Sequence, residues 1–198
     1  EKVCYGQHTN ICVGKPITDP KQIPSICGED GLFKPSSAYR QAKEDFVEVD
    51  QAVLEIEAQY RRFVELTGEQ PRYFEGHAIA SENFLKGLEI VAKKHQLPLL
   101  PFSLKGPVRF GNTDLYPSMD SMKPDYDPFE SLKAAALKDY GDRGCCMFVC
   151  HPGYLDDYIL RTSSLTVART KEVAMACDPQ VRQWLKDNGI ELVTYDDL

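Results

Sequence analysis

Histidine is the residue type whose positions in this chain most clearly suggest chemistry. The 198 residues include only four histidines, and His8, His77 and His151 each directly follow a short run that predicts a β-strand. In α/β sheets and barrels the carboxyl ends of the strands form the ligand-binding face, so these three side chains are expected to converge there. Imidazole is the commonest neutral metal ligand and the usual acid or base near neutral pH. The pattern leaves two interpretations open, a metal-dependent hydrolase and a set of hydrogen-bonded loop histidines.

His8 and His77 supply two of the ligands that such a metal site needs. A catalytic metal normally takes about three protein ligands and keeps one position for water. No carboxylate that completes the set is obvious beside the two histidines, and Glu75 is the closest in sequence. The fourth histidine, His95, lies near the polar end of a predicted helix and is expected to be solvated.

Strands and helices alternate along the chain, which predicts an α/β fold with a parallel sheet and a single domain over residues 1–198. Strand-like runs occupy residues 2–5, 72–74, 145–150 and 190–194, and the third is expected to be buried on both faces. Apolar spacing and end signals predict helices over 38–67, 82–97, 128–140, 167–176 and 179–188. The Gly- and Pro-rich stretches 11–37 and 99–127 predict long loops.

Composition excludes several classes of protein. The 30 acidic residues outnumber the 23 basic ones, which argues against a nucleic-acid or anionic-membrane partner. No apolar run approaches the roughly 18 residues of a membrane-spanning helix, and no signal-peptide pattern opens the chain. The odd number of cysteines, seven, predicts reduced thiols in a cytoplasmic protein rather than a disulfide framework. The oligomeric state is left open, a homodimer included.

Four segments carry a resemblance to a known family. Residues 6–16 are similar to a G-x-H-x-x-x-x-x-G-x-P segment, and residues 71–77 to a P-x-x-x-D-S-H segment in which Glu75 takes the place of the acid. Residues 150–154 match C-H-P-G-Y, and residues 163–172 resemble S-x-x-x-x-x-R-x-x-E. Together these segments resemble the YdjC-like carbohydrate deacetylases, the family that includes chitooligosaccharide deacetylase.

The resemblance implies a fold and an activity. It implies an irregular (β/α) barrel like that of polysaccharide deacetylases, and a metal-dependent hydrolase that removes N-acetyl groups from an oligosaccharide. A divalent metal, Mg or Zn, is expected to be bound by His8, His77 and an aspartate. His151 is expected to be the general acid that protonates the amine leaving group.

Three further residues are expected at the substrate. Arg169 is expected to orient His151 or a carboxylate, or to bind a sugar phosphate, with a surface salt bridge to Glu172 as the alternative. Tyr154 is expected to stack on a sugar ring, packing being the alternative. Asn10 is expected either to bind substrate through a hydrogen bond or to fix its own loop.

The chain departs from the family pattern in two places. The opening strand that ends in an Asp-Asp pair is absent, and we expect an N-terminal truncation because a barrel without its first strands exposes sheet edges. After His77 the chain continues Ala78-Ile79-Ala80-Ser81 where the family has further histidines, which leaves the exact sugar open. Two alternatives remain: a non-catalytic sugar-binding or regulatory protein, and a metal-dependent hydrolase of another ester or phosphate.

Overall fold

The computed structural model describes residues 3–101, 103 and 106–198. Internal contacts divide the chain into two units, the first formed by Glu1–Phe102 with Thr194–Leu198 and the second by Ser103–Val193. Both units contain helices and strands, which confirms the predicted α/β class. The single domain over residues 1–198 stays a prediction. No helix in the described part of the chain has the length and apolar character needed to cross a membrane.

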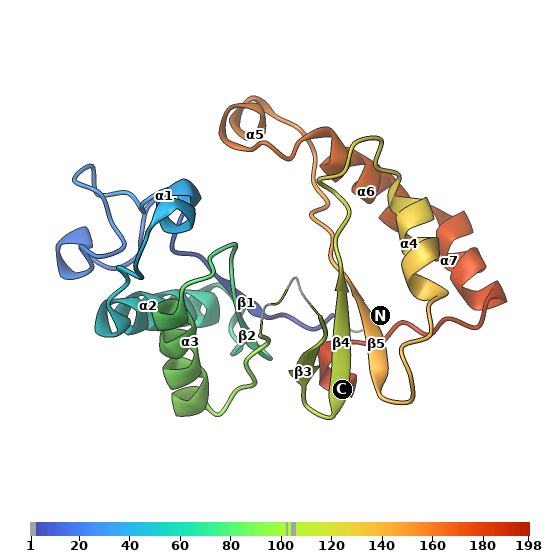
Figure 1. Ribbon diagram of the computed structural model, residues 1–198, viewed down its shortest axis with the longest axis horizontal. Coiled ribbons are helices and arrows are strands. Elements are labelled where there is room, and N and C mark those ends of the chain that lie inside the picture. Colours follow the sequence, from blue (N-terminus) through green and yellow to red (C-terminus); the bar gives the residue numbers. More distant parts are fainter. Residues whose placement is uncertain (1–2, 102, 104–105) are drawn as a thin grey trace. The chain divides into compact units, whose positions relative to one another are not determined.

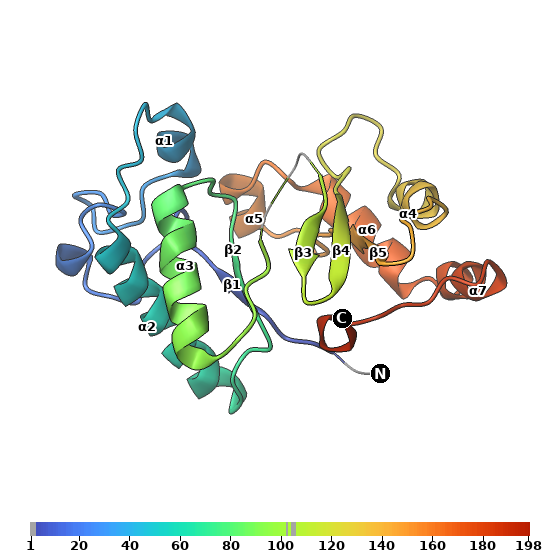
Figure 2. The same ribbon diagram turned by 60° about the horizontal axis from the view of Figure 1, so that its bottom comes forward.

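The first unit is built on a short parallel strand pair. Strand β1 (Gln7–Thr9) pairs with β2 (Phe74–Gly76), so that His8 lies opposite Glu75. Two long helices, α2 (Val49–Thr67) and α3 (Glu82–His95), pack on each other and against these strands, as Figures 1 and 2 show. Helix α1 (Ser36–Gln41) and 3₁₀ turns at Pro20–Gln22 and Tyr195–Asp197 complete the unit.

The core of the first unit lies between α2, α3 and β2. Ile56, Phe74, Phe84 and Leu88 are fully buried there. Gly87 allows the two helices to approach closely, because a Cβ at this position would lie 3.0 Å from the Ile56 side chain and 3.2 Å from the Ala52 Cβ. The strand pair that carries His8 is therefore supported by a well-packed layer.

The predicted helix over 38–67 is divided in two by residues 42–48, which are not helical. The Asp45 carboxylate accepts hydrogen bonds from the Val47 and Asn83 N–H groups and from the Ser81 hydroxyl. Such side-chain contacts offer the backbone an alternative to the helical ladder. The predicted C-terminal end of this helix and the predicted start of the next are confirmed. Gly68 ends α2 with a backbone in the left-handed region, and Ser81 caps α3 by accepting the Phe84 N–H.

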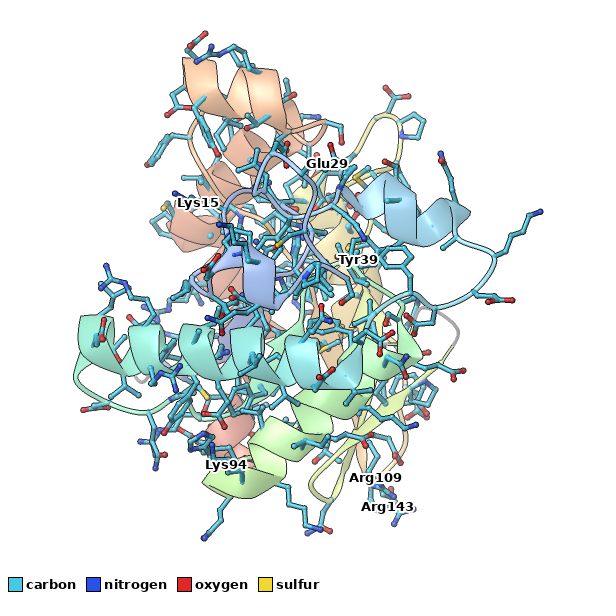
Figure 3. All side chains as sticks on the ribbon, turned by 90° about the vertical axis from the view of Figure 1, so that its left-hand side faces the viewer. Lys15, Glu29, Tyr39, Lys94, Arg109 and Arg143 are labelled. Carbon is cyan, nitrogen blue, oxygen red and sulfur yellow. The ribbon has the colours of Figure 1, made fainter. Side chains whose placement is uncertain are left out.

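The structure contradicts the predicted solvation of His95. Its side chain is only 19 % exposed, its ring stacks on Tyr60 at 3.8 Å, and its Nε2 lies 3.1 Å from Glu57 Oε1. Lys94, which Figure 3 shows at the end of α3, lies 2.7 Å from the same oxygen. Burial alone raises the pKa of Glu57, but the hydrogen bonds from Lys94 and His95 outweigh burial and hold this pKa below its usual value.

Replacement of Glu57 by Gln should make the stability of the protein less dependent on pH. A lowered pKa in the folded state means that the unfolded chain binds the proton more readily. The stabilisation by the Glu57 charge is therefore complete above the unfolded pKa of about 4.5 and is lost as the pH falls from there through the lower pKa of the folded state. We expect Glu57→Gln to cost about 1 kcal/mol at pH 7 and clearly less at pH 3.5. Urea unfolding of both proteins at the two pH values measures this; an equal cost at both would contradict the assignment.

The second unit contains a mixed three-stranded sheet. Strand β4 (Thr113–Ser118) pairs antiparallel with β3 (Val108–Phe110) and parallel with β5 (Gly144–Phe148). Helix α4 (Pro128–Ala136) packs against β5 and against α6 (Val167–Cys177), as Figure 1 illustrates. The remaining helices are α5 (Asp157–Thr162) and α7 (Pro179–Asp187). Neither sheet closes into a barrel within the described residues.

Several predicted elements of the second unit are wrong. The predicted loop 99–127 contains β3 and β4, and residues 190–194 form no strand, because Ile190 donates its N–H to Leu185 at the end of α7. All residues of β5 are half-buried, since the strand lies at the edge of its sheet, rather than buried on both faces. The Asp127-Pro128 and Asp178-Pro179 helix starts are confirmed, and both aspartates accept N–H groups of the first turn.

Candidate functional site

The strand pair of the first unit brings two of the predicted metal ligands together. His8 Nε2 lies 2.8 Å from His77 Nδ1, and the two rings meet edge to face at 4.9 Å. On its other side His8 Nδ1 lies 2.9 Å from Glu75 Oε1. His77 directly follows β2, as predicted, and its N–H donates to the Thr9 carbonyl, so the ladder continues to this residue.

His8 lies in the middle of a strand, whereas the sequence predicts a strand over residues 2–5 followed by a turn at His8. Lys2 lies outside the described residues, and residues 3–6 form no strand. The side chain of Gln7 points toward α2, where it donates to the Ile56 carbonyl. Because successive side chains of a strand point to opposite faces, Gln7 and Thr9 are buried and His8 between them is exposed. The strand therefore presents the imidazole on its outer face, opposite Glu75.

Glu75 determines which ring nitrogen of a neutral His8 carries the proton. An ionised carboxylate can only accept a hydrogen bond, so in a neutral His8 ring Nδ1 carries the proton and Nε2 accepts a hydrogen bond from His77 Nδ1. Metal-binding histidines are commonly held in this way, with a carboxylate on the nitrogen that does not bind the metal. The two imidazoles are therefore donors of the kind that a divalent metal takes, and they supply two of the roughly three protein ligands of a catalytic site. In residues 3–101, 103 and 106–198, however, no group of three His, Cys, Asp or Glu side chains is spaced to hold one.

Asn10 fixes the loop that follows β1. Its Oδ1 accepts the N–H groups of Cys12 and Val13, and its Nδ2 donates to the Val13 carbonyl at 2.7 Å. This is the second of the two roles expected for Asn10; a contact with substrate stays a prediction.

Two residues of α2 hold the same loop and were missed in the sequence. Gln59 bonds both the N–H and the carbonyl of Asn10, and the buried Glu55 carboxylate accepts the N–H groups of Ile17 and Thr18. The sequence does contain a signal for these two residues, because polar side chains at positions 55 and 59 interrupt the apolar face of an amphipathic helix. Together they anchor the segment that leaves the His8 strand.

In the second unit His151 lies three residues beyond β5, in the stretch 149–156 that forms neither helix nor strand. Its backbone is held from α6 on both sides: the N–H donates to Glu172 Oε2 at 2.6 Å, and the carbonyl accepts from Arg169 Nη1 at 3.2 Å. Tyr154, three residues further, is 81 % exposed. The predicted acid, Arg169 and an exposed aromatic ring thus occur in one segment and its supporting helix.

Glu172 is fully buried beneath this segment. Its second oxygen accepts the Tyr126 hydroxyl at 3.0 Å, so the partners of Glu172 are not those of the alternative salt bridge with Arg169. Burial and the hydrogen bond to Glu172 raise the pKa of Tyr126 above its usual range. Burial and the charge of Glu172 raise the pKa of Cys150 to about 12, so that this thiol stays protonated at neutral pH and is not a nucleophile.

Comparison with known proteins gives a consistent picture. The family model described as YdjC-like protein matches residues 1–187. Carbohydrate deacetylase 2 of Listeria innocua is 28% identical over 98% of this chain and 76% of its own length, and chitooligosaccharide deacetylase of Proteus mirabilis is 28% identical over 98% and 77%. A crystal structure from Enterococcus faecalis V583, of a protein proposed to cleave cellobiose phosphate, shares the fold with a TM-score of 0.77 and 20% identity over 98% of this chain and 77% of that one. This chain belongs to the YdjC-like protein family.

Proposed function

We propose that this chain is a carbohydrate deacetylase, a metal-dependent hydrolase that removes acetyl groups from an N-acetylated oligosaccharide. The observation that carries the proposal is the His8–His77 pair, backed by Glu75, in a chain of the YdjC-like family. Family relatives from Listeria innocua, Geobacillus stearothermophilus and Proteus mirabilis, which are named carbohydrate or chitooligosaccharide deacetylases, support it.

His8 and His77, whose rings lie against each other, would hold the metal. Imidazole ligands favour Zn over Mg, which prefers oxygen. When bound, a divalent metal polarises the acetamide carbonyl and stabilises the negative charge that develops on its oxygen. Glu75 accepts a hydrogen bond from His8 Nδ1, and so keeps the opposite nitrogen available as a ligand.

His151 would supply the proton that the leaving amine requires. Cleavage of a C–N bond without protonation expels an amide anion, so a positioned general acid accelerates this step strongly. The half-buried imidazole is attached to a backbone that Arg169 and Glu172 hold in place. The contact of Arg169 with the His151 carbonyl supports our proposal that Arg169 orients His151.

Tyr154 would provide the sugar platform, because its exposed ring is available for stacking on a pyranose face. All seven cysteines are free thiols, which supports our proposal that the protein works in a reducing compartment, the cytoplasm.

The test is acetate release from N-acetylated chitooligosaccharides, before and after treatment with a chelator and after addition of Zn²⁺ or Mg²⁺. We expect release that the chelator abolishes and Zn²⁺ restores. Metal-loaded protein that releases no acetate from any N-acetylated oligosaccharide would disprove the deacetylase, and release that survives complete metal removal would disprove metal dependence.

A further inference from the structure

We propose that Glu172 is a positioning residue for His151: its buried carboxylate fixes the peptide group of His151 and thereby the direction of the imidazole. The proposal rests on the function proposed above, in which His151 is the general acid. Glu172 itself lies below the segment and acts on the reaction only through His151.

The burial of Glu172 is what makes its contacts significant. A carboxylate with no exposed surface is unfavourable unless hydrogen bonds replace its lost hydration. Two donors do so, the His151 N–H at 2.6 Å and the Tyr126 hydroxyl at 3.0 Å, and Lys171 fixes Tyr126 in turn by donating to its carbonyl at 2.7 Å. One oxygen is thus directed to the peptide of His151, and the other is anchored within the unit.

Arg169 complements this contact from the same helix. Residues three apart lie on one face of a helix, so Arg169 and Glu172 reach the carbonyl and the N–H of His151 together. The neighbouring backbone is also fixed, because Val149 donates to the Ser118 carbonyl of β4 and Gly153 donates to the Arg169 carbonyl. The backbone of His151 is therefore held at both its N–H and its carbonyl, although the segment has no regular secondary structure.

Orientation matters for a general acid, which must lie within hydrogen-bond reach of the atom that it protonates. A displacement of about 1 Å at a reacting group can cost about 10²-fold in rate. Glu172→Gln keeps the size of the side chain but removes the charge that strengthens the bond to the His151 N–H. We therefore expect a less rigid His151 peptide in this variant.

The first test observes the peptide directly and does not depend on activity. In ¹⁵N-labelled protein, the His151 amide proton should resonate downfield and exchange slowly with solvent, as expected for a short bond to a carboxylate. In Glu172→Gln it should move upfield and exchange faster, whereas Glu191→Gln, which removes the same charge at an exposed position of this unit, should leave it unchanged. An unchanged His151 amide in Glu172→Gln would overturn the proposal.

The second test separates positioning from general structural damage. Glu172→Gln should lower kcat for an N-acetylated chitooligosaccharide about 10- to 100-fold with KM unchanged. Hydrolysis of an aryl acetate, whose phenolate leaves without protonation, should change little. Tyr126→Phe, which leaves the bond to His151 in place, should lose less than Glu172→Gln.

Equal losses of Glu172→Gln on the amide and the ester, or no loss on either, would overturn the proposal. Absence of acetate release by the wild-type protein would disprove the proposed function instead, and the amide resonance would still decide whether Glu172 holds His151.

Discussion

His8→Ala is expected to lower kcat/KM for acetate release by about 10³-fold and to remove the bound metal. A Lewis-acid metal contributes several kcal/mol to the stabilisation of a developing oxyanion, and each 1.4 kcal/mol is about tenfold in rate. His8 Nε2 is one of only two imidazole nitrogens that face each other in the described part of the chain, so one remaining ligand would not retain the ion. Metal analysis of the purified variant, combined with steady-state kinetics, measures both effects.

Glu75→Gln is expected to have a smaller effect on metal binding and activity than His8→Ala. Gln can still accept a bond from His8 Nδ1 but no longer carries the charge, and loss of such a supporting contact typically costs about 10- to 100-fold in metal affinity or activity. Glu89→Gln, a change of the same charge at an exposed position of α3, should behave like the wild-type protein. A His8→Ala protein that retained its metal and its activity would remove the histidine pair from the proposed site.

The helices of this protein could be predicted well from the sequence because the signals that define them are local. Ser81, Asp127 and Asp178 precede their helices and accept N–H groups of the first turn, and Gly68 and Gly189 adopt positive φ beyond the last turn. Each of these signals acts over four residues or fewer. The division of the predicted helix over 38–67 was missed because the partners of Asp45 at Ser81 and Asn83 are distant in sequence.

The strands were predicted less accurately because they depend on distant partners. Strand β1 consists of three residues whose pairing partners lie 67 residues further along the chain, and apolar content shifted its predicted position toward the N-terminus. The β3–β4 hairpin did have a local signal, the Gly111-Asn112 turn, which lies between a strand-like run and Thr113. That signal was overlooked because proline and glycine are frequent throughout residues 99–127.

The candidate site shows the same division between local and distant information. The position of His77 directly after a strand is confirmed, because the strand-to-turn transition is visible in the sequence, whereas His151 lies three residues beyond β5, which ends at Phe148 rather than at the predicted Cys150. The contacts of Glu172 with Tyr126 and His151 connect residues 46 and 21 positions apart, and no spacing rule predicts them. The expected solvation of His95 was wrong for the same reason, since its partner Glu57 lies on another helix.

His151→Ala is expected to lower kcat for N-acetylated chitooligosaccharides by about 10²- to 10⁴-fold, the usual contribution of a general acid. KM and metal content should stay close to the wild-type values, because the side chain is proposed to act on the leaving group alone. Added imidazole should restore part of the rate by donating the proton from the space that the side chain leaves. Acetate release measured against imidazole concentration gives this result.

Two comparisons decide how that loss is interpreted. Leu160→Ala, an exposed change on α5 in the same unit, should retain wild-type activity and exclude a general effect of side-chain truncation. The double variant Glu172→Gln/His151→Ala should be no slower than His151→Ala, because a residue that acts only through another has no further effect once that residue is absent. Additive losses would show that Glu172 acts independently, and a raised KM without rescue by imidazole would assign His151 to substrate binding rather than to proton donation.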